Sequence, residues 1–100
     1  MIIREQDAGR TIQVSRGELI ILRLAENPTT GYRWTVESSQ GLELIDDQNF
    51  FGEGLGAGGA RVLQFRSRRN GECELRLKHW REWEGETSVI GRFQVHLVVE

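Results

Sequence analysis

Short runs in which apolar and polar residues alternate are the feature that most constrains how this chain can fold. In the last such run, four apolar residues share one face of an extended segment: Phe93, Val95, Leu97 and Val99. Arg92, Gln94 and His96 fall on the opposite face. A period of two is typical of a half-buried antiparallel strand, and no segment has the period of an amphipathic helix. The sequence therefore predicts an all-β chain.

The predicted strands are short and follow one another closely. We expect them at residues 11–14, 18–25, 32–36, 42–45, 60–68, 72–80 and 92–99. Six or seven short strands at this spacing predict an immunoglobulin-like antiparallel β-sandwich of about seven strands. The single cysteine, Cys73, excludes an intrachain disulfide.

One turn signal stands between two alternating runs. Asn70 and Gly71 separate residues 60–68 from residues 72–80. An Asn-Gly pair in this position is the strongest short-range signal for a β-hairpin. We therefore expect these two strands to pair antiparallel, with a register that the turn sets.

Size and charge limit the class of protein. The 100 residues fit a single domain, residues 1–100, which can bury a core without disulfides or metal. With 13 basic and 15 acidic residues the net charge is -2, and no apolar run has membrane-spanning length. We expect a monomer that binds neither nucleic acid nor a membrane. The chain as given is expected in the cytoplasm, or in the periplasm or secreted if a leader was removed.

Few residues could carry catalysis or hold a cofactor. Cys73 and His79 share a predicted strand face, but six residues of strand separate them by roughly 20 Å, so they form no dyad. Two histidines and one cysteine give no metal-ligand spacing. Gly54, Gly56 and Gly59 have the spacing of a dinucleotide fingerprint, but a predicted strand follows them instead of a helix. We expect no enzyme, no cofactor and no metal.

Residues 27–32, Asn-Pro-Thr-Thr-Gly-Tyr, are too elaborate for a plain chain reversal. Pro28 fixes one φ angle, and Gly31 is free to adopt a positive φ. Thr29 and Thr30 are β-branched, so little conformational entropy remains to be lost on docking. The segment is predicted to be a rigid loop presented to a partner. The alternative is a structural turn in which the threonine hydroxyls cap local backbone groups.

Residues 78–86 interrupt the strand pattern with two tryptophans and an arginine. Tryptophan and arginine dominate binding hot spots, so Trp80, Arg81 and Trp83 favour an interface. The structural alternative is that Trp80 or Trp83 folds back over the end of the sandwich and covers core. An alternative function is an immunoglobulin-like adhesion or carbohydrate-binding module that uses these two tryptophans as stacking platforms.

A third unusual segment lies between these two in the sequence. Residues 52–59 contain five glycines, which predicts a flexible connection or a loop whose bare backbone can approach a partner. In an immunoglobulin-like sandwich, three such connections can cluster at one end. We expect them to form one three-part binding edge, as antibody loops form a paratope.

These segments resemble, in order, the motifs of the chagasin-type inhibitors of papain-like cysteine peptidases. The family pattern is Asn-Pro-Thr-Thr-Gly-Tyr/Phe, then Gly-x-Gly-Gly, then Arg-Pro-Trp. Residues 27–32 match the first motif without change, residues 56–59 match the second, and residues 81–83 match the third except that Glu82 replaces proline. The similarity spans nearly the whole chain.

The resemblance implies a sandwich that blocks the active-site cleft of a papain-like cysteine peptidase, reversibly and without being cleaved. It implies that Thr29 and Thr30 lie beside the catalytic cysteine, with Thr29 the nearer. Trp83 and Arg81 would hold one side of the cleft, and the glycine loop the other. The peptidase-binding residues that it implies are Asn27, Pro28, Thr29, Thr30, Gly31, Tyr32, Gly56, Gly58, Gly59, Arg81 and Trp83.

Overall fold

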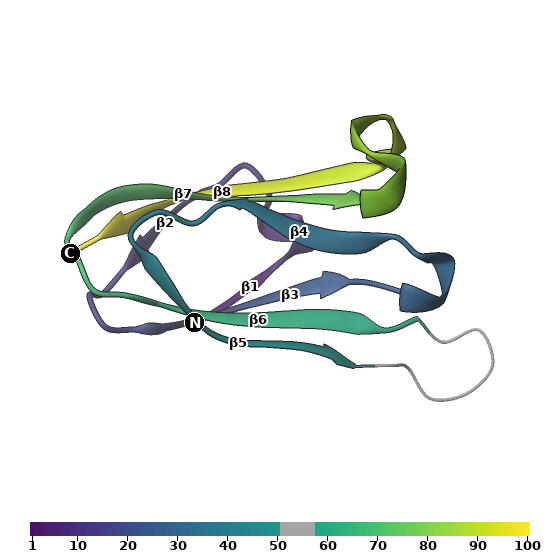
Figure 1. The fold of residues 1–100 in the computed structure, drawn as a ribbon. Helices are drawn as coiled ribbons and strands as arrows, with labels where there is room; N and C mark the ends of the chain where they lie inside the picture. The colour runs from purple at the N-terminus through teal and green to yellow at the C-terminus, as the bar shows by residue number, and fades with distance from the viewer. Residues whose placement is uncertain (51–57) are drawn as a thin grey trace.

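The chain forms two β-sheets that pack face to face (Figure 1) in a computed structural model that describes residues 1–50 and 58–100. The first sheet has the order β1-β3-β6-β5, with bounds β1 (Ile2–Arg4), β3 (Leu19–Ala25), β6 (Ala60–Ser67) and β5 (Leu42–Phe50). The second has the order β2-β8-β7-β4, with bounds β2 (Thr11–Val14), β8 (Gly91–Val99), β7 (Gly71–Trp80) and β4 (Arg33–Ser38). Connections between strands in the described residues contain four short 3-10 turns: η1 (Glu5–Asp7), η2 (Pro28–Thr30), η3 (Glu82–Glu84) and η4 (Glu86–Ser88).

The core lies between the sheets and consists of the inward side chains of the alternating runs. In β8 the four predicted apolar residues are at most 3% exposed. The same holds for Ile20, Leu22 and Leu24 in β3, and for Leu75 and Leu77 in β7. The predicted faces of these three strands are therefore confirmed. Burial of this kind contributes about 25 cal/mol for each Å² of apolar surface removed from water.

Two details of the predicted sandwich are corrected. The described residues form eight strands, because β1 is an additional strand before the first predicted one. The sandwich is also not wholly antiparallel, since β1 pairs with β3 and β2 pairs with β8 in parallel. Both exceptions are short edge strands, and η1 lies between them where the chain passes from one sheet to the other. The N-terminal segment thus covers one open edge of each sheet.

The predicted hairpin at Asn70 and Gly71 is wrong. The strand before it, β6, pairs with β3 and β5, whereas the strand after it, β7, pairs with β4 and β8. A two-residue hairpin of the Asn-Gly type needs positive φ at both central residues. Gly71 has a φ of +123°, but no non-glycine residue in the described part of the chain has a positive φ. The turn therefore carries the chain from one sheet to the other.

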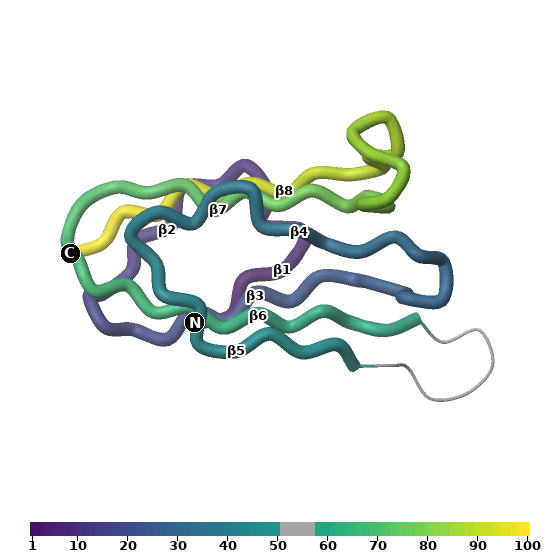
Figure 2. Tube along the Cα trace, in the orientation of Figure 1, coloured from purple at the N-terminus to yellow at the C-terminus, as the bar shows by residue number. Residues whose placement is uncertain are grey.

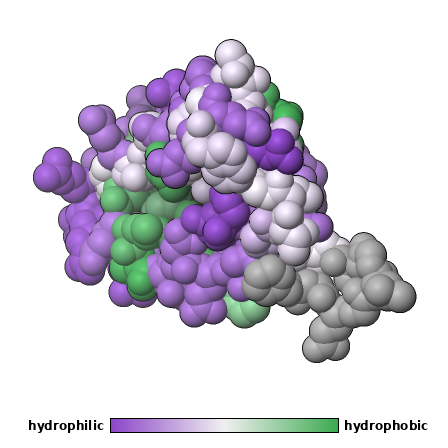
Figure 3. Space-filling view, turned by 45° about the vertical axis from the view of Figure 1, so that its right-hand side comes forward, coloured by the Kyte–Doolittle hydropathy of each residue, from purple (hydrophilic) through white to green (hydrophobic). Residues whose placement is uncertain are grey.

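The sandwich is elongated, and its two ends differ. The loop between β3 and β4 and the loop between β7 and β8 lie at the same end, at the right of Figure 1, and the same trace is followed in Figure 2. The β6–β7 connection lies at the opposite end, near the C-terminus. In Figure 3, which turns the first end toward the viewer, polar residues cover most of the described surface. No helix among the described residues has the length and apolar character needed to cross a membrane.

Candidate functional site

The loop from Asn27 to Tyr32 is held in shape by its own polar groups. Asn27 Oδ1 accepts hydrogen bonds from Thr29 N–H (3.2 Å) and Thr29 Oγ1 (2.6 Å). The backbone oxygen of Asn27 accepts from Thr30 Oγ1 (2.8 Å) and Thr30 N–H (3.1 Å). Thr30 Oγ1 in turn accepts from Tyr32 N–H (3.3 Å). The predicted capping of backbone groups is therefore confirmed for the Thr30 hydroxyl, whereas the Thr29 hydroxyl bonds the side chain of Asn27; both bonds stiffen the loop.

Gly31 ends this turn and touches the second loop. Its φ is +82°, in the left-handed region that the sequence predicted. A Cβ atom added at this position would lie 2.5 Å from Cη2 of Trp83. Gly31 and Trp83, which are 52 positions apart in the sequence, are therefore packed against each other.

Arg81 joins the same two loops. Its Nε and Nη2 both donate to the backbone oxygen of Thr30, at 3.1 and 3.0 Å. The guanidinium also lies over the ring of Tyr32, 4.3 Å from the ring centroid, and Nη1 contacts Glu84 Oε1 at 3.2 Å. The planar fork of arginine suits this combination of two donors and an aromatic face. Arg81, which the sequence placed in the interface, thus ties the loops together.

A buried hydroxyl, that of Ser88, helps to hold the loop that carries Trp83. Ser88 Oγ accepts from Arg81 N–H at 3.0 Å, and lies 2.9 Å and 2.6 Å from the carbonyl oxygens of Arg81 and Gly85. These contacts link η3 and η4 to the end of β7. The Trp83 side chain remains on the surface, and the residue is 71% exposed. Trp83 therefore does not cover core, and an exposed tryptophan on an ordered loop is suited to contact a partner.

Trp80 behaves differently from Trp83. Its indole Nε1 donates to Thr35 Oγ1 at 2.9 Å, and Lys78 Nζ lies over its ring, 3.5 Å from the centroid. Trp80 is half-buried. One ring face of Trp80 is therefore occupied within the protein by Lys78 and is not free to stack on a ligand.

The glycine segment is described only from Gly58 onward, so Gly56 lies outside the described residues. Gly59 packs against backbone, because a Cβ added there would lie 2.5 Å from Phe50 O and 2.7 Å from Glu26 O. A hollow between the three segments is lined by residues from each of them. They include Asn27, Thr30, Tyr32, Gly58, Gly59 and Arg81. The predicted convergence therefore holds for the described residues of all three segments.

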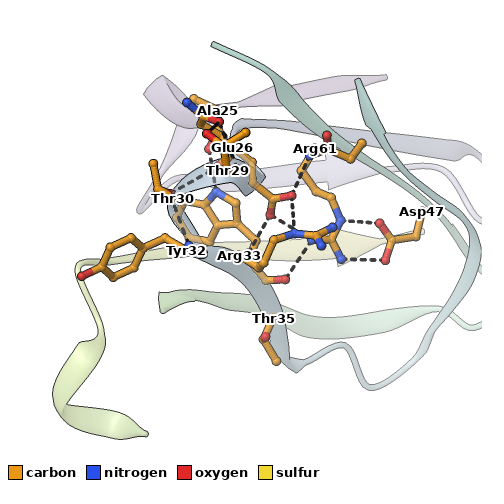
Figure 4. Close-up of polar contacts among 12 residues, drawn as sticks. Ala25, Glu26, Thr29, Thr30, Tyr32, Arg33, Thr35, Asp47 and Arg61 are labelled. Atoms are coloured by element: carbon orange, nitrogen blue, oxygen red, sulfur yellow. Dashed lines mark hydrogen bonds and ion pairs between the residues drawn. The ribbon is translucent and has the colours of Figure 1, made fainter. Parts of the chain in front are cut away.

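A buried carboxylate lies directly before the first loop (Figure 4). Glu26 is 2% exposed, and its carboxylate accepts four hydrogen bonds. The donors are Trp34 N–H at 2.7 Å, Arg33 Nε at 2.9 Å, Asn49 Nδ2 at 2.7 Å and Arg61 Nη1 at 2.9 Å. Arg61 also binds Asp47 through two hydrogen bonds of 2.5 and 2.9 Å. No motif in the sequence predicted this cluster.

The charges in this cluster stabilise one another. Burial acts to raise the pKa of Glu26, but the Trp34 amide and the charges of Arg61 and Arg33 outweigh it and hold the pKa below its ordinary value. The hydrogen bond from Arg61 likewise lowers the pKa of Asp47. Asp46 and Asp47 both lie within β5, so the strand itself places Asp47 against Arg61.

One sequence signal could have revealed Glu26. The inward positions of β3 are Ile20, Leu22 and Leu24, and the same period of two places Glu26 next on the buried side. A carboxylate at a position that alternation assigns to the core needs charged or hydrogen-bonding partners.

The described residues do not present a catalytic arrangement. Cys73 pairs with Leu97 and His79 with Gly91, which places them toward opposite ends of β7, and burial raises the pKa of the Cys73 thiol. His79 stacks on Trp34, with ring centroids 4.5 Å apart. No group of three or more potential metal ligands occurs among residues 1–50 and 58–100. The chemistry that the site offers is that of a rigid surface for binding.

Comparison with known proteins identifies the family. Residues 13–97 match the family model described as Chagasin family peptidase inhibitor I42. The chain is 34% identical over 87 residues to Amoebiasin-1 of Entamoeba histolytica, covering 83% of this chain and 84% of that protein. It is 30% identical over 97 residues to Chagasin of Trypanosoma cruzi, covering 89% and 88%. The chain therefore belongs to the chagasin family of peptidase inhibitors, and it is an inhibitor and not an enzyme.

Solved structures agree on the fold. The crystal structure of the cysteine protease inhibitor EhICP2 from Entamoeba histolytica matches with a TM-score of 0.90 at 24% identity, covering 99% of this chain and 94% of that chain. PbICP-C, solved in complex with falcipain-2, matches with a TM-score of 0.61 at 15% identity, covering 99% and 98%. These similarities confirm the predicted immunoglobulin-like β-sandwich.

Proposed function

We propose that this chain inhibits papain-like cysteine peptidases by filling the active-site cleft with the three segments at one end of the sandwich. We call the described part of these segments the wedge, and define it as residues 27–32, 58–59 and 81–83. The observation that carries the proposal is the packing of the first segment against the third, through Gly31 with Trp83 and Thr30 with Arg81. A surface made of interlocked loops can enter a groove as one body.

The threonine loop is the part of the wedge that reaches the catalytic cysteine in this proposal. Thr29 and Thr30 are both exposed, while their hydroxyl protons are donated to Asn27. The loop is fixed by hydrogen bonds within itself, so it has little freedom to bring a peptide carbonyl into attack geometry. Displacement of a reacting group by about 1 Å costs roughly a hundredfold in rate. The inhibitor therefore occupies the cleft and is not cleaved.

Trp83 supplies contact area on one wall of the cleft, and the glycine segment, through Gly56 and Gly58, allows close backbone approach on the other, while Gly59 holds that segment against Glu26 and Phe50. Trp83 is the large apolar side chain of the wedge that is most exposed in the described residues. Arg81 acts in the wedge by joining Thr30 to the Trp83 loop. Because the loops are ordered before binding, a standard interface of about 1,600 Å² can reach high affinity without a large entropic cost.

The test is a reversible inhibition assay with papain and a small panel of related peptidases. The wild-type protein is expected to inhibit at or below micromolar concentration and to be recovered intact, as checked by mass spectrometry. Thr29→Arg places a bulky charge at the exposed tip of the loop and should abolish inhibition. Thr11→Arg, at another exposed threonine in β2, is the matched control and should inhibit like the wild type.

Two results would contradict the proposal. One is the absence of inhibition of any panel member at micromolar concentration. The other is equal inhibition by Thr29→Arg and Thr11→Arg, because that would place the binding surface away from the threonine loop.

A further inference from the structure

We propose that Glu26 is the positioning residue of the wedge, fixing the threonine loop relative to the glycine segment before any peptidase binds. This inference rests on the proposed function and assigns a role to a residue outside the three motifs. Glu26 does not contact the peptidase in this account. It acts through the backbone groups on either side of the loop.

The carboxylate of Glu26 accepts hydrogen bonds from residues of three strands. Arg33 and Trp34 belong to β4, Asn49 belongs to β5 and Arg61 belongs to β6. Because β4 lies in one sheet and the other two strands lie in the other, the carboxylate bridges both layers at the end where the wedge is built. Figure 4 shows the carboxylate of Glu26 between the side chains of Arg33 and Arg61.

The backbone of Glu26 contacts the second segment of the wedge. Its N–H donates to Gly59 O at 3.1 Å, and its own carbonyl oxygen lies against Gly59, where an added Cβ would be 2.7 Å away. The next residue, Asn27, accepts the hydrogen bonds that shape the threonine loop. A shift of Glu26 would therefore move two segments of the wedge together.

Trp34 closes the base of the threonine loop against the same residue. Its backbone N–H donates to Glu26, and its indole Nε1 donates to Ala25 O at 2.8 Å. Together with the bond from Arg33 Nε to Glu26, three hydrogen bonds thus join the chain that enters the loop to the strand that leaves it. Arg61 adds a further connection, since Nη1 also donates to Trp34 O at 3.1 Å while Asp47 fixes the guanidinium from the other side.

Stability alone is a poor reason for this arrangement. A buried ion pair is often replaceable by well-packed apolar residues without loss of stability, because desolvation offsets the attraction. An apolar side chain at position 26 could fill the space, but it could not direct four donors to one point. Hydrogen bonds of this kind specify orientation, and orientation is what a preformed binding edge requires.

The experiment compares Glu26→Gln with Glu43→Gln in the full chain. The first variant keeps the shape and removes the charge, while the second removes an exposed carboxylate that pairs with Arg68 at the other end of the sandwich. The dissociation constant and off-rate for papain are measured well below the melting temperature of each variant. Glu26→Gln should raise the dissociation constant about tenfold through a faster off-rate, and Glu43→Gln should leave it within about twofold.

A double variant separates positioning from stability. If Glu26 sets the loop position, the factor by which Thr29→Ala raises the dissociation constant should be at least about threefold smaller in the Glu26→Gln background than in the wild type. The reason is that a displaced loop makes weaker contacts with the peptidase, so less is lost when Thr29 is shortened.

If Glu26→Gln does not fold, Asn49→Ala replaces it, since this change deletes one donor to the carboxylate. Asn49→Ala should raise the dissociation constant about twofold or more. An unchanged dissociation constant in a folded variant, or strictly multiplicative effects in the double variant, would overturn the inference.

A second readout does not depend on the peptidase. Amide hydrogen exchange of the free protein should be faster at Thr30 and Gly31 in Glu26→Gln, with unchanged exchange at Leu75 and Leu77 in the core. Equal exchange at the loop amides in both proteins would overturn the positioning role. If the wild type inhibits no peptidase while the loop amides respond as stated, the proposed function fails and the positioning role remains.

Discussion

The two loops that meet at Gly31 and Trp83 reach their shapes by different means. The threonine hydroxyls of the first loop form hydrogen bonds to Asn27 within that loop. The buried carboxylate of Glu26 lies directly before it in the chain. The Trp83 loop is held by the hydroxyl of Ser88, by backbone hydrogen bonds within its two 3-10 turns, by the bonds from Arg81 to Thr30 and by ion pairs such as that between Lys78 and Glu86. One loop therefore supplies a fixed shape, and the other supplies an exposed aromatic side chain. Changes to the first should alter stability and affinity together, whereas changes to Trp83 should alter affinity alone.

The largest expected effect is the acid sensitivity of the charge cluster beneath the threonine loop. Since the pKa of Glu26 is held below its ordinary value of 4.5 in the folded protein, its contribution to stability is complete above pH 4.5 and is lost as the pH falls through the lowered pKa. The free energy of unfolding, measured by urea denaturation from about pH 7 to pH 2, should fall more steeply for the wild type than for Glu26→Gln.

Glu86 provides the matched control on the other loop. Hydrogen bonds from Lys78 and Arg92 lower the pKa of this carboxyl as well, but the group is exposed and its ion pairs are screened by solvent. Glu86→Gln should therefore follow the wild-type pH profile closely. Parallel profiles for the wild type and Glu26→Gln would contradict the difference between the two loops.

The second effect concerns contact area. Trp83→Ala should weaken binding to papain by about 2 kcal/mol or more, because an exposed aromatic anchor is a typical hot spot. The melting temperature should be nearly unchanged, since Trp83 is 71% exposed and its ring edge lies against Gly31, which has no side chain. Calorimetric binding and thermal unfolding check the two expectations separately. A loss of stability with unchanged affinity would mean that Trp83 is structural.

The third effect tests the contact between the loops. Gly31→Ala places a Cβ where φ is +82° and where Trp83 Cη2 would be 2.5 Å away. Backbone strain should lower stability by about 1–2 kcal/mol, and displacement of Trp83 should lower affinity further. Gly17→Ala is the control for strain, because Gly17 has a φ of +84° with no neighbouring atom within 4 Å. Equal effects of the two changes on papain affinity would show that the loop contact is unimportant.

The smallest expected effect is a gain in stability and in affinity for papain. Glu82 is the first residue of η3 and follows Arg81, whose φ of -99° and ψ of 108° are extended. This geometry suits a proline, which is favoured at the first helical position and requires an extended residue before it. Glu82→Pro should raise stability by about 0.4–1 kcal/mol and tighten papain binding modestly. A weaker inhibitor would show that Glu82 itself contacts the peptidase.

Long alternating strands could be predicted from the sequence because burial of one face leaves a direct period-two signal. The strands β3, β7 and β8 were found in this way, close to their observed bounds. Three-residue β1 was missed, since it is too short to display alternation and is set by pairing with β3. The hairpin at Asn70 and Gly71 was predicted wrongly because the residue types alone do not determine the φ angles of the turn. Of the two residues, only Gly71 has a positive φ.

The candidate site was predictable in its motifs but not in its internal contacts. The rigidity of the threonine loop and the positive φ of Gly31 follow from residue types, and both were predicted. The double hydrogen bond from Arg81 to Thr30 joins residues 51 positions apart, so no local pattern could indicate it. The role of Glu26 depends on donors from three strands, and only its inward position in the β3 alternation could have suggested burial.

A crystal structure of the protein bound to papain tests the central claim most directly. The account predicts the Asn27–Tyr32 loop in the cleft with Thr29 nearest the catalytic cysteine, the peptide bond between Thr29 and Thr30 intact, and Trp83 against one wall. A complex in which the cleft is empty and papain is held by the opposite end of the sandwich, around Asn70, would contradict it.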